Sequence, residues 1–429
     1  PPPARGRRGG GARAGRRAAP RPRPDPGERL LRRRRLRARG RGVHGGGDRA
    51  RADEQGARRR GDRRGVSEAS PQPEIRIDQL TGLRTILAGA RADRPIDFEP
   101  ATRDTSDEGG GAGREAEETP SNACAFCEGS ESKTPPEVWA DRPGGGPADS
   151  PGWRVRAVPN LYPALVADAE EAGGGVGGDA PPADPLLASA RAGEPDLFSS
   201  APAQGAHEVV ISSPRHRTAL AQLADDELAI AVAGWRERIA AHAESSSCVQ
   251  LIVNEGGGAG ASLEHSHAQL YALAFVPVLI ARERERFTAY AQRTAGGELL
   301  ADVAAEEVRR RERLVAIDDE AMLVCPWASG SPYQLRIIPR RAEARFELDG
   351  EVGVAALRTA LRALRARFSG GPELNLWVRT APRDADAFHW HIDIAPRLAF
   401  KAGFELATGV DINVMPPERA AEELRESLG

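Results

Sequence analysis

The chain has 429 residues, which is enough for two domains of ordinary size, and its formal net charge is −2. That value hides two opposite parts, because residues 1–64 carry 23 arginines and 6 acidic residues, whereas the remainder carries 37 basic and 56 acidic residues. The acidic body does not favour nucleic acid, and no apolar run approaches the ~20 residues that span a bilayer. With no signal peptide visible either, we expect a soluble, cytoplasmic protein without a membrane partner.

Residues 1–73 form a low-complexity extension that is rich in arginine, glycine and proline. Few of its residues are apolar, so we expect this extension to be disordered. An arginine-rich arm of this composition could bind nucleic acid. It could equally be a dispensable extension, and we favour that second interpretation.

Ordered structure is expected from Glu74 onward, as an N-terminal half that covers residues 74–280. A long amphipathic helix is predicted over residues 219–244. The acidic, glycine-rich stretch 101–120 is expected to form a loop, and residues 167–204, which are rich in alanine, glycine, aspartate and proline, are expected to form a mobile insertion. Apolar patterns predict strands at residues 74–80, 84–90, 153–160, 207–213, 249–255 and 269–277.

A C-terminal half over residues 281–429 shows the same kinds of element. Residues 281–314 are charged and helical, and residues 354–368 form a helix with leucines at helical spacing. Strands are predicted at residues 321–327, 333–339, 374–380 and 388–396. Strands, a long helix and a histidine-bearing strand occur in both halves, so the sequence predicts an α+β fold of two related modules with antiparallel sheet.

The most informative segment runs from Asn254 through a glycine run to His265, His267 and Gln269. In a strand these last three side chains would share one face. Glycine lets backbone N–H groups approach a phosphate closely, and a neutral imidazole beside that phosphate is a nucleophile. The run lacks the Lys-Ser/Thr ending of a P-loop and the spacing of a dinucleotide fingerprint. We therefore predict a phosphate-handling histidine site of another kind.

Cys124 and Cys127 have the C-x-x-C spacing of zinc ligands, and no second such pair exists in the chain. A structural zinc needs four ligands, so histidines must complete the site. His207, His216 and His265 are the candidates that spacing leaves open. A redox function is less favoured, because no thioredoxin-like βαβ pattern surrounds the pair.

Near the C-terminus, His389 and His391 could hold a second metal or form the wall of an active site. Glu283, in a charged helical segment, is most simply a solvated helix charge.

These pieces resemble the galactose-1-phosphate uridylyltransferase family, which is the transferase branch of the histidine-triad superfamily. The likeness covers roughly residues 74–429, and its motifs are CAFC, VPNLYPAL, HEVVISSPRH, NEGGGAGASLEHSHAQ, SPYQLRIIPRR, FHWHIDIAPR, AGFE and PPERAAEELR. The resemblance implies two histidine-triad-like α+β halves whose antiparallel sheets form a half-barrel.

The family works by a ping-pong route through a uridylyl-histidine, moving UMP from UDP-glucose to galactose 1-phosphate. The resemblance implies that His267 is the nucleophile and that Gln269 holds a phosphate oxygen; Ser266 replaces the proline of the family motif. It implies a structural zinc on Cys124, Cys127, His216 and His265. It also implies phosphate contacts from Asn254 and Ser262, a nucleoside contact from Asn160, and hexose contacts from Phe400 and Glu405.

This sequence departs from the family pattern at two other places. Some members hold a second metal, iron or zinc, through a glutamate and three histidines. Glu283, His389 and His391 match three of those ligands, but Ala342 stands where the third histidine is expected. We therefore expect that site to be weakly occupied or empty. The hexose segment reads AFKAGFE, with alanine where some members have lysine and Phe404 where they have tyrosine, which leaves the sugar open.

Three alternatives remain. A histidine-triad hydrolase would carry a histidine at position 269, where glutamine cannot act as an acid or base, so a transferase is favoured. A related enzyme that uses ADP-glucose, such as an ADP-glucose phosphorylase, differs in a base that these motifs do not reveal. If the chain is a nucleic-acid-binding protein, its affinity should fall steeply as the salt concentration rises and should vanish when residues 1–70 are removed. The expected partners are a nucleotide sugar and a sugar 1-phosphate, and a homodimer is one assembly that we consider.

Overall fold

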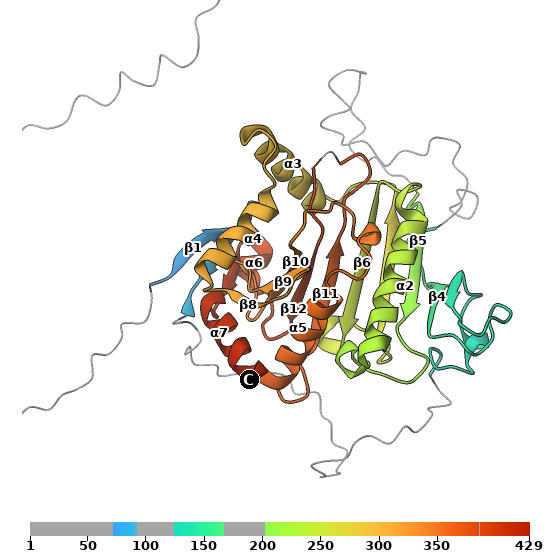
Figure 1. The fold of residues 1–429 in the computed structure, drawn as a ribbon. Coiled ribbons are helices and arrows are strands. Elements are labelled where there is room, and N and C mark those ends of the chain that lie inside the picture. Colours follow the sequence, from blue (N-terminus) through green and yellow to red (C-terminus); the bar gives the residue numbers. More distant parts are fainter. Residues whose placement is uncertain (1–71, 90, 92–123, 167–201, 386) are drawn as a thin grey trace, which may run out of the picture. The chain divides into compact units, whose positions relative to one another are not determined.

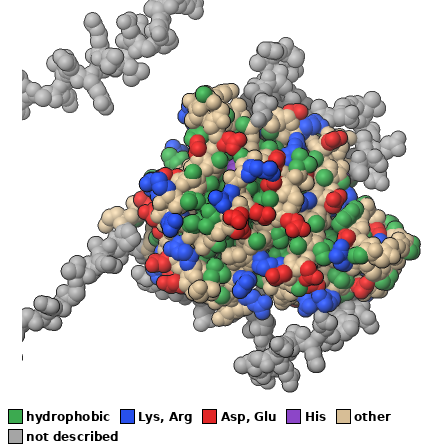
Figure 2. All heavy atoms as spheres, viewed as in Figure 1, with side chains coloured by type: hydrophobic (Ala, Val, Ile, Leu, Met, Phe, Trp, Pro, Cys, Tyr) green, Lys and Arg blue, Asp and Glu red, His purple; other side chains and the backbone are tan. Residues whose placement is uncertain are grey.

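The computed structural model describes residues 72–89, 91, 124–166, 202–385 and 387–429, all of which belong to one compact unit, Glu68–Gly429. The predicted disordered extension lies outside the described residues except for 72 and 73, as do the loop 101–120 and most of the loop 167–204. Among the described helices, none is long and apolar enough to cross a membrane. On the face shown in Figure 2, side chains of both charges are interspersed.

One antiparallel sheet of ten strands forms the centre of the fold (Figure 1). Its strand order is β3-β4-β5-β7-β6-β11-β12-β10-β9-β8, so the sheet is open and β3 and β8 are its edges. The prediction of an α+β fold whose antiparallel sheets form a half-barrel is therefore confirmed, since the sheet is not closed. The strands are β3 (Trp139–Asp141), β4 (Val155–Pro159), β5 (Gly205–Ile211), β6 (Cys248–Glu255), β7 (His267–Leu273), β8 (Leu314–Ile317), β9 (Ala321–Val324), β10 (Leu335–Pro339), β11 (Leu374–Arg379) and β12 (His391–Pro396).

Helices α2 (Asp225–Ala243) and α5 (Val354–Arg367) pack on one face of this sheet, over a single large apolar core. The predicted helix 219–244 begins later than expected. Residues Leu220–Gln222 form a separate 3-10 turn, and the acidic first turn of α2 starts at Asp225, where Glu227 accepts a hydrogen bond from the Ala224 N–H (2.9 Å). Acidic side chains stabilise a helix N-terminus, which explains the later start.

The opposite face of the sheet is covered mainly over its C-terminal strands. Helices α3 (Val278–Arg293) and α4 (Leu299–Arg310) replace the single helical stretch predicted at 281–314, with Gly296 and Gly297 between them. A second apolar cluster joins these helices to β9 and β10. β1 (Glu74–Ile77), β2 (Arg84–Leu87) and β13 (Asp411–Asn413) form a small separate sheet. In the chain, β13 lies between α6 (Gly403–Thr408) and α7 (Pro417–Leu428).

Strands β6, β7 and β11 alternate between buried residues and half-buried residues. The buried positions face the helix-covered core, so the half-buried positions share the other face, because successive side chains of a strand point to opposite sides. Cross-strand register on that face aligns Gln269 with Ile252, and Ile252 with Trp377. This row of half-buried side chains carries residues of the candidate site.

Candidate active site

The glycine run forms the turn between β6 and β7. Gly256 and Gly260 have φ values of 85° and 88°, in the region that side chains other than glycine rarely adopt. Between them lies one 3-10 turn, Gly257–Ala259. His265 was expected to share a strand with His267 and Gln269, but β7 begins at His267. His265 therefore belongs to the turn, and its side chain meets the cysteines instead of the row on β7.

His267 is the first residue of β7 and only 6% exposed. Its Nδ1–H donates a hydrogen bond of 2.7 Å to the carbonyl oxygen of His265. That bond fixes the tautomer and leaves the Nε2 lone pair available. Burial lowers the pKa of His267 below its ordinary value, so the ring is neutral near pH 7. A neutral, oriented imidazole next to a glycine turn is suited to attack a phosphorus atom.

Gln269 lies two residues further along β7, on the same face. Its Oε1 lies 3.1 Å from Nε2 of His207 and accepts a hydrogen bond from the Tyr271 hydroxyl at 2.9 Å. Asn160, at the end of β4, reaches the same group, since its Nδ2 lies 3.2 Å from His207 Nε2. The structure thus brings Asn160 and Gln269 together, and it adds His207 and Tyr271 to them.

Four side chains that were predicted as zinc ligands come together next to the nucleophile. The sulfurs of Cys124 and Cys127 and one nitrogen each of His216 and His265 all lie within 4.8 Å of one another. Cys124 Sγ is 3.5 Å from His265 Nδ1, and Cys127 Sγ is 3.5 Å from His216 Nδ1 and 3.7 Å from His265 Nδ1. His207, which spacing had left open as a ligand, faces Gln269 instead.

These separations fit a tetrahedral zinc. With Zn–S near 2.3 Å and Zn–N near 2.0–2.1 Å, tetrahedral geometry puts sulfur and nitrogen about 3.5 Å apart. The far nitrogen of His265, Nε2, donates to the carbonyl of Ser213 (2.9 Å), which is the usual support of a metal-binding histidine. Burial, and then the neighbouring Cys124, raise the pKa of Cys127 to about 11, so a stable thiolate there needs a nearby cation. The donor set and its geometry are those of a structural zinc site.

Phe126 links this Cys/His group to the nucleophile. It lies between the two cysteines in sequence, and its ring packs edge-on against His267 with centroids 5.2 Å apart. It also belongs to a small apolar cluster with Trp153, Val158 and Ile211. The segment from Cys124 to Cys127, called the cysteine loop below, must therefore be ordered for Phe126 to hold the ring of His267 in place.

Asn254 is the second-last residue of β6, and the β6–β7 register, which pairs Val253 with Ala268, puts it opposite His267. Its Oδ1 accepts a hydrogen bond from Asn375 Nδ2 (2.8 Å), which also donates to the carbonyl of Ala259 in the glycine turn (2.8 Å). The amide group of Asn254 is thereby oriented with its NH₂ away from Asn375. Ser262 lies exposed on the turn, between the 3-10 segment and β7.

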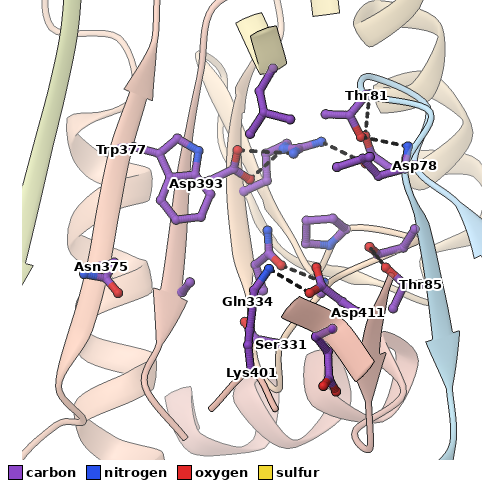
Figure 3. A pocket seen from close by; sticks show the side chains of 18 of the residues that line it. Asp78, Thr81, Thr85, Ser331, Gln334, Asn375, Trp377, Asp393, Lys401 and Asp411 are labelled. Carbon is purple, nitrogen blue, oxygen red and sulfur yellow. Dashed lines mark hydrogen bonds and ion pairs between the residues drawn. The ribbon is translucent and has the colours of Figure 1, made fainter. Parts of the chain in front are cut away.

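A cavity of about 370 Å³ continues the site toward the C-terminal half (Figure 3). Asn375, Trp377 and Asp393 project into it from β11 and β12, and Asp78 and Thr85 approach from the small sheet. Phe400 and Glu405, the predicted hexose contacts, both line this cavity. Phe400 is 71% exposed, and Glu405 accepts a hydrogen bond from the Ala402 N–H (3.0 Å) at the start of α6.

At the second predicted metal site, Glu283 is only 2% exposed, so its interpretation as a solvated helix charge is wrong. Glu283 faces Arg379 (3.3 Å), His389 donates through Nε2 to the carbonyl of Pro339 (3.1 Å), and His391 donates through Nδ1 to the carbonyl of His389 (3.2 Å). Within the described part of the chain, the Cys124 group is the only set of three or more such side chains with mutually close ligand atoms. Glu283 Oε2, His389 Nδ1 and His391 Nε2 are buried and have no hydrogen-bond partner among the described residues, and occupancy of the second site stays a prediction.

Tyr271 and Asn375 were not identified from the sequence, and His207 was considered there only as a zinc ligand. His207 and Tyr271 are directly paired across β5 and β7, and their rings stack with centroids 4.1 Å apart. The alternation His267-x-Gln269-x-Tyr271 was visible in the sequence, and it could have identified Tyr271. Nothing local could have indicated Asn375, which lies 121 residues from its partner Asn254.

Comparisons with known proteins agree with the family resemblance found in the sequence. Residues 181–277 match the family model described as galactose-1-phosphate uridyl transferase, N-terminal domain. The chain is 27% identical to an ADP-glucose phosphorylase of Arabidopsis thaliana, over 86% of this chain and 96% of that protein. It is 30% identical to a galactose-1-phosphate uridylyltransferase of Cryptococcus neoformans, over 57% of this chain and 71% of that protein.

A solved structure shares the fold over most of its length. The crystal structure of an ADP-glucose phosphorylase from Arabidopsis thaliana with bound ADP-glucose superposes with a TM-score of 0.62 and 25% identity. The match covers 83% of this chain and 99% of that one.

Proposed function

This chain belongs to the galactose-1-phosphate uridylyltransferase family, and we propose that it transfers a nucleotidyl group from a nucleotide sugar through a covalent intermediate on His267. The observation that carries this proposal is the hydrogen bond from His267 Nδ1 to the His265 carbonyl (2.7 Å). It leaves Nε2 as a free nucleophile beside the glycine turn and Gln269.

In the first step, Nε2 of His267 attacks the α-phosphorus of the nucleotide sugar. An N–P bond forms, the P–O bond to the sugar phosphate breaks, and the sugar 1-phosphate leaves with that electron pair. Negative charge grows on the non-bridging oxygens, to which amides of the glycine turn, Ser262, Asn254 and Gln269 would donate. The positive charge left on the ring is stabilised by the His265 carbonyl, which accepts the Nδ1–H.

In the second step, an oxygen of the acceptor phosphate attacks the same phosphorus, and the N–P bond breaks. The electron pair returns to Nε2, so His267 is neutral again. The acceptor is a sugar 1-phosphate in a uridylyltransferase and inorganic phosphate in a phosphorylase. Because one product leaves before the second substrate reacts, the kinetics are ping-pong.

Cys124, Cys127, His216 and His265 would hold zinc in a structural role. When bound, the ion neutralises the two thiolates and fixes the turn that precedes β7. The chain's own part is then to hold the His265 carbonyl in place, since that carbonyl orients His267.

Two nucleotide sugars are supported as the donor substrate by different observations. The relative that matches 86% of this chain is named an ADP-glucose phosphorylase, and a structure of such an enzyme with bound ADP-glucose shares the fold. The uridylyltransferase relative has higher identity over a shorter stretch, which favours UDP-glucose and galactose 1-phosphate. We take ADP-glucose as the first candidate because of the longer match, and UDP-glucose as the second.

The test is to mix the protein with ADP-glucose or UDP-glucose alone and to measure its intact mass. An AMP or UMP adduct on His267, located by peptide mapping and absent in His267→Ala, is the expected result. The adduct should disappear on addition of phosphate or galactose 1-phosphate, whichever is the acceptor. An adduct on another residue, or sequential kinetics without an adduct, would refute the assignment of the nucleophile.

A further inference from the structure

A backbone hydrogen bond determines which ring nitrogen of His207 carries the proton. Its Nδ1 accepts a hydrogen bond from the N–H of Ala164 (3.1 Å). A backbone N–H can only donate, so the proton of the neutral ring must be on Nε2. Burial lowers the pKa of His207, which keeps the ring neutral. His207 therefore presents an N–H to its other neighbours.

That N–H decides the orientation of Gln269. The amide atom that faces His207 Nε2 (3.1 Å) must be the oxygen, because Nε2–H donates, and the Tyr271 hydroxyl, which can donate or accept, then donates to the same oxygen (2.9 Å). The stacked rings of His207 and Tyr271 hold the two donors on the same side of the amide. The NH₂ group of Gln269 is consequently turned away from both, as a free pair of donors.

Asn160 is oriented by the same logic. Its Oδ1 accepts from the N–H of Tyr162 (2.9 Å), so its NH₂ is the group that lies 3.2 Å from His207 Nε2. Both of these atoms carry hydrogen, so this approach is a packing contact and not a hydrogen bond. Two amide NH₂ groups, from Asn160 and Gln269, are thus left as donors around one buried histidine.

We propose that His207 is a positioning residue that holds the Gln269 amide with its NH₂ toward a non-bridging oxygen of the transferred phosphate. This inference rests on the proposed function and names a residue that the function did not require. His207 acts through Gln269 and does not itself touch a reacting atom. An amide that turned over would present its oxygen to the phosphate and would repel the charge that grows there.

A competing explanation is that His207 merely anchors residues 160–165 through the Ala164 hydrogen bond. Two substitutions separate these explanations. His207→Gln keeps a side-chain N–H at the distance of Nε2 but lacks the acceptor at Nδ1. His207→Asn keeps an acceptor at the distance of Nδ1 but cannot reach Gln269.

The variants are compared by the single-turnover rate of adduct formation and by donor affinity, with ADP-glucose and UDP-glucose as the probes. His207→Asn should lower the rate by about 10- to 100-fold, as expected for a misplaced donor, with little change in affinity. His207→Gln should stay close to wild type. In a Gln269→Ala background, His207→Asn should change the rate by about twofold or less, because both act through one contact. The proposal would be overturned if His207→Gln slowed adduct formation more than His207→Asn does. It would also be overturned if His207→Asn slowed the Gln269→Ala variant by as much as it slows the wild-type protein.

Nuclear magnetic resonance provides a test that does not depend on turnover. Ring ¹⁵N shifts of His207 in the wild-type protein should report the proton on Nε2, and the Gln269 side-chain amide signal should shift in His207→Asn but not in His207→Gln. A proton on Nδ1 would refute the inference even if the enzyme is active. If neither nucleotide sugar labels the wild-type protein, the proposed function fails, while these spectra still decide whether His207 orients Gln269.

Discussion

Loss of the Cys/His group should remove both zinc and the order of the turn that carries the nucleophile. We expect one zinc per chain, and we expect Cys127→Ser to abolish it, because Cys127 Sγ lies 3.5 Å from one histidine nitrogen and 3.7 Å from the other. A hydroxyl is a poor replacement for a thiolate at a tetrahedral zinc. Cys248→Ala is the matched control, since this buried cysteine on β6 is outside the group and should leave the zinc content unchanged.

The size of the effect follows from linkage between binding and folding. Zinc at roughly 1,000 times its dissociation constant stabilises the folded state by about 4 kcal/mol. At roughly 2–4 °C per kcal/mol for a chain of this kind, chelation should lower Tm by about 10 °C. The apolar contacts around Cys124 and Cys127 are few, with Phe126 and Trp153 as the large members. The cysteine loop should therefore open before the main sheet unfolds.

Three measurements check this prediction. Elemental analysis should give one zinc per chain, and X-ray absorption should show two sulfur and two nitrogen neighbours at about 2.3 and 2.0–2.1 Å. Hydrogen exchange should rise first at residues 124–134 after chelation. Active protein without zinc, or a metal shell without sulfur, would show that the reasoning is wrong.

Three further predictions concern other parts of the molecule. Burial raises the pKa of Glu255 to about 7, whereas the unfolded value is near 4.5. The stability that this group contributes is therefore complete below pH 4.5 and falls by about 3 kcal/mol as the pH rises to 7. Glu255→Gln should remove that loss in urea titrations at pH 4.5 and pH 8, and an unchanged difference between the two pH values would argue against it. Gly256→Ala should cost about 1–3 kcal/mol, since φ is 85° and the new Cβ would meet Glu373 at 2.3 Å; Gly260→Ala, with open space at its Cβ, should cost less. Removal of residues 1–70 should leave adduct formation intact and abolish any salt-dependent binding to nucleic acid; loss of the adduct would mean that the extension has a part in catalysis.

The elements of this protein follow closely from local sequence patterns. Strand alternation, the leucine spacing of α5 and the glycine turn were all predicted near their observed positions, because burial on one face imposes a period on the residues. Strands β3, β8 and β13 were not predicted, and other errors occurred at ends and breaks. The 219–244 helix lost its first turns to a 3-10 segment, and the 281–314 helix is divided at Gly296 and Gly297. Ends depend on capping contacts and on neighbours, which apolar periodicity does not encode.

The sequence by itself determined the chemistry: a C-x-x-C pair, a histidine after a glycine run and a glutamine in phase with it. Spacing could not decide whether His207 or His216 joins the cysteines, and only the resemblance to a family pointed to His216. The tertiary structure decided that His216 lies near Cys127 and that His207 faces Gln269, 62 residues away in the chain. The contact between His207 and Gln269 is set by the register of β5 against β7, and a shift of one residue would turn the whole row to the other face. Register is fixed by the buried core on the far side of the sheet, so no local motif could reveal it.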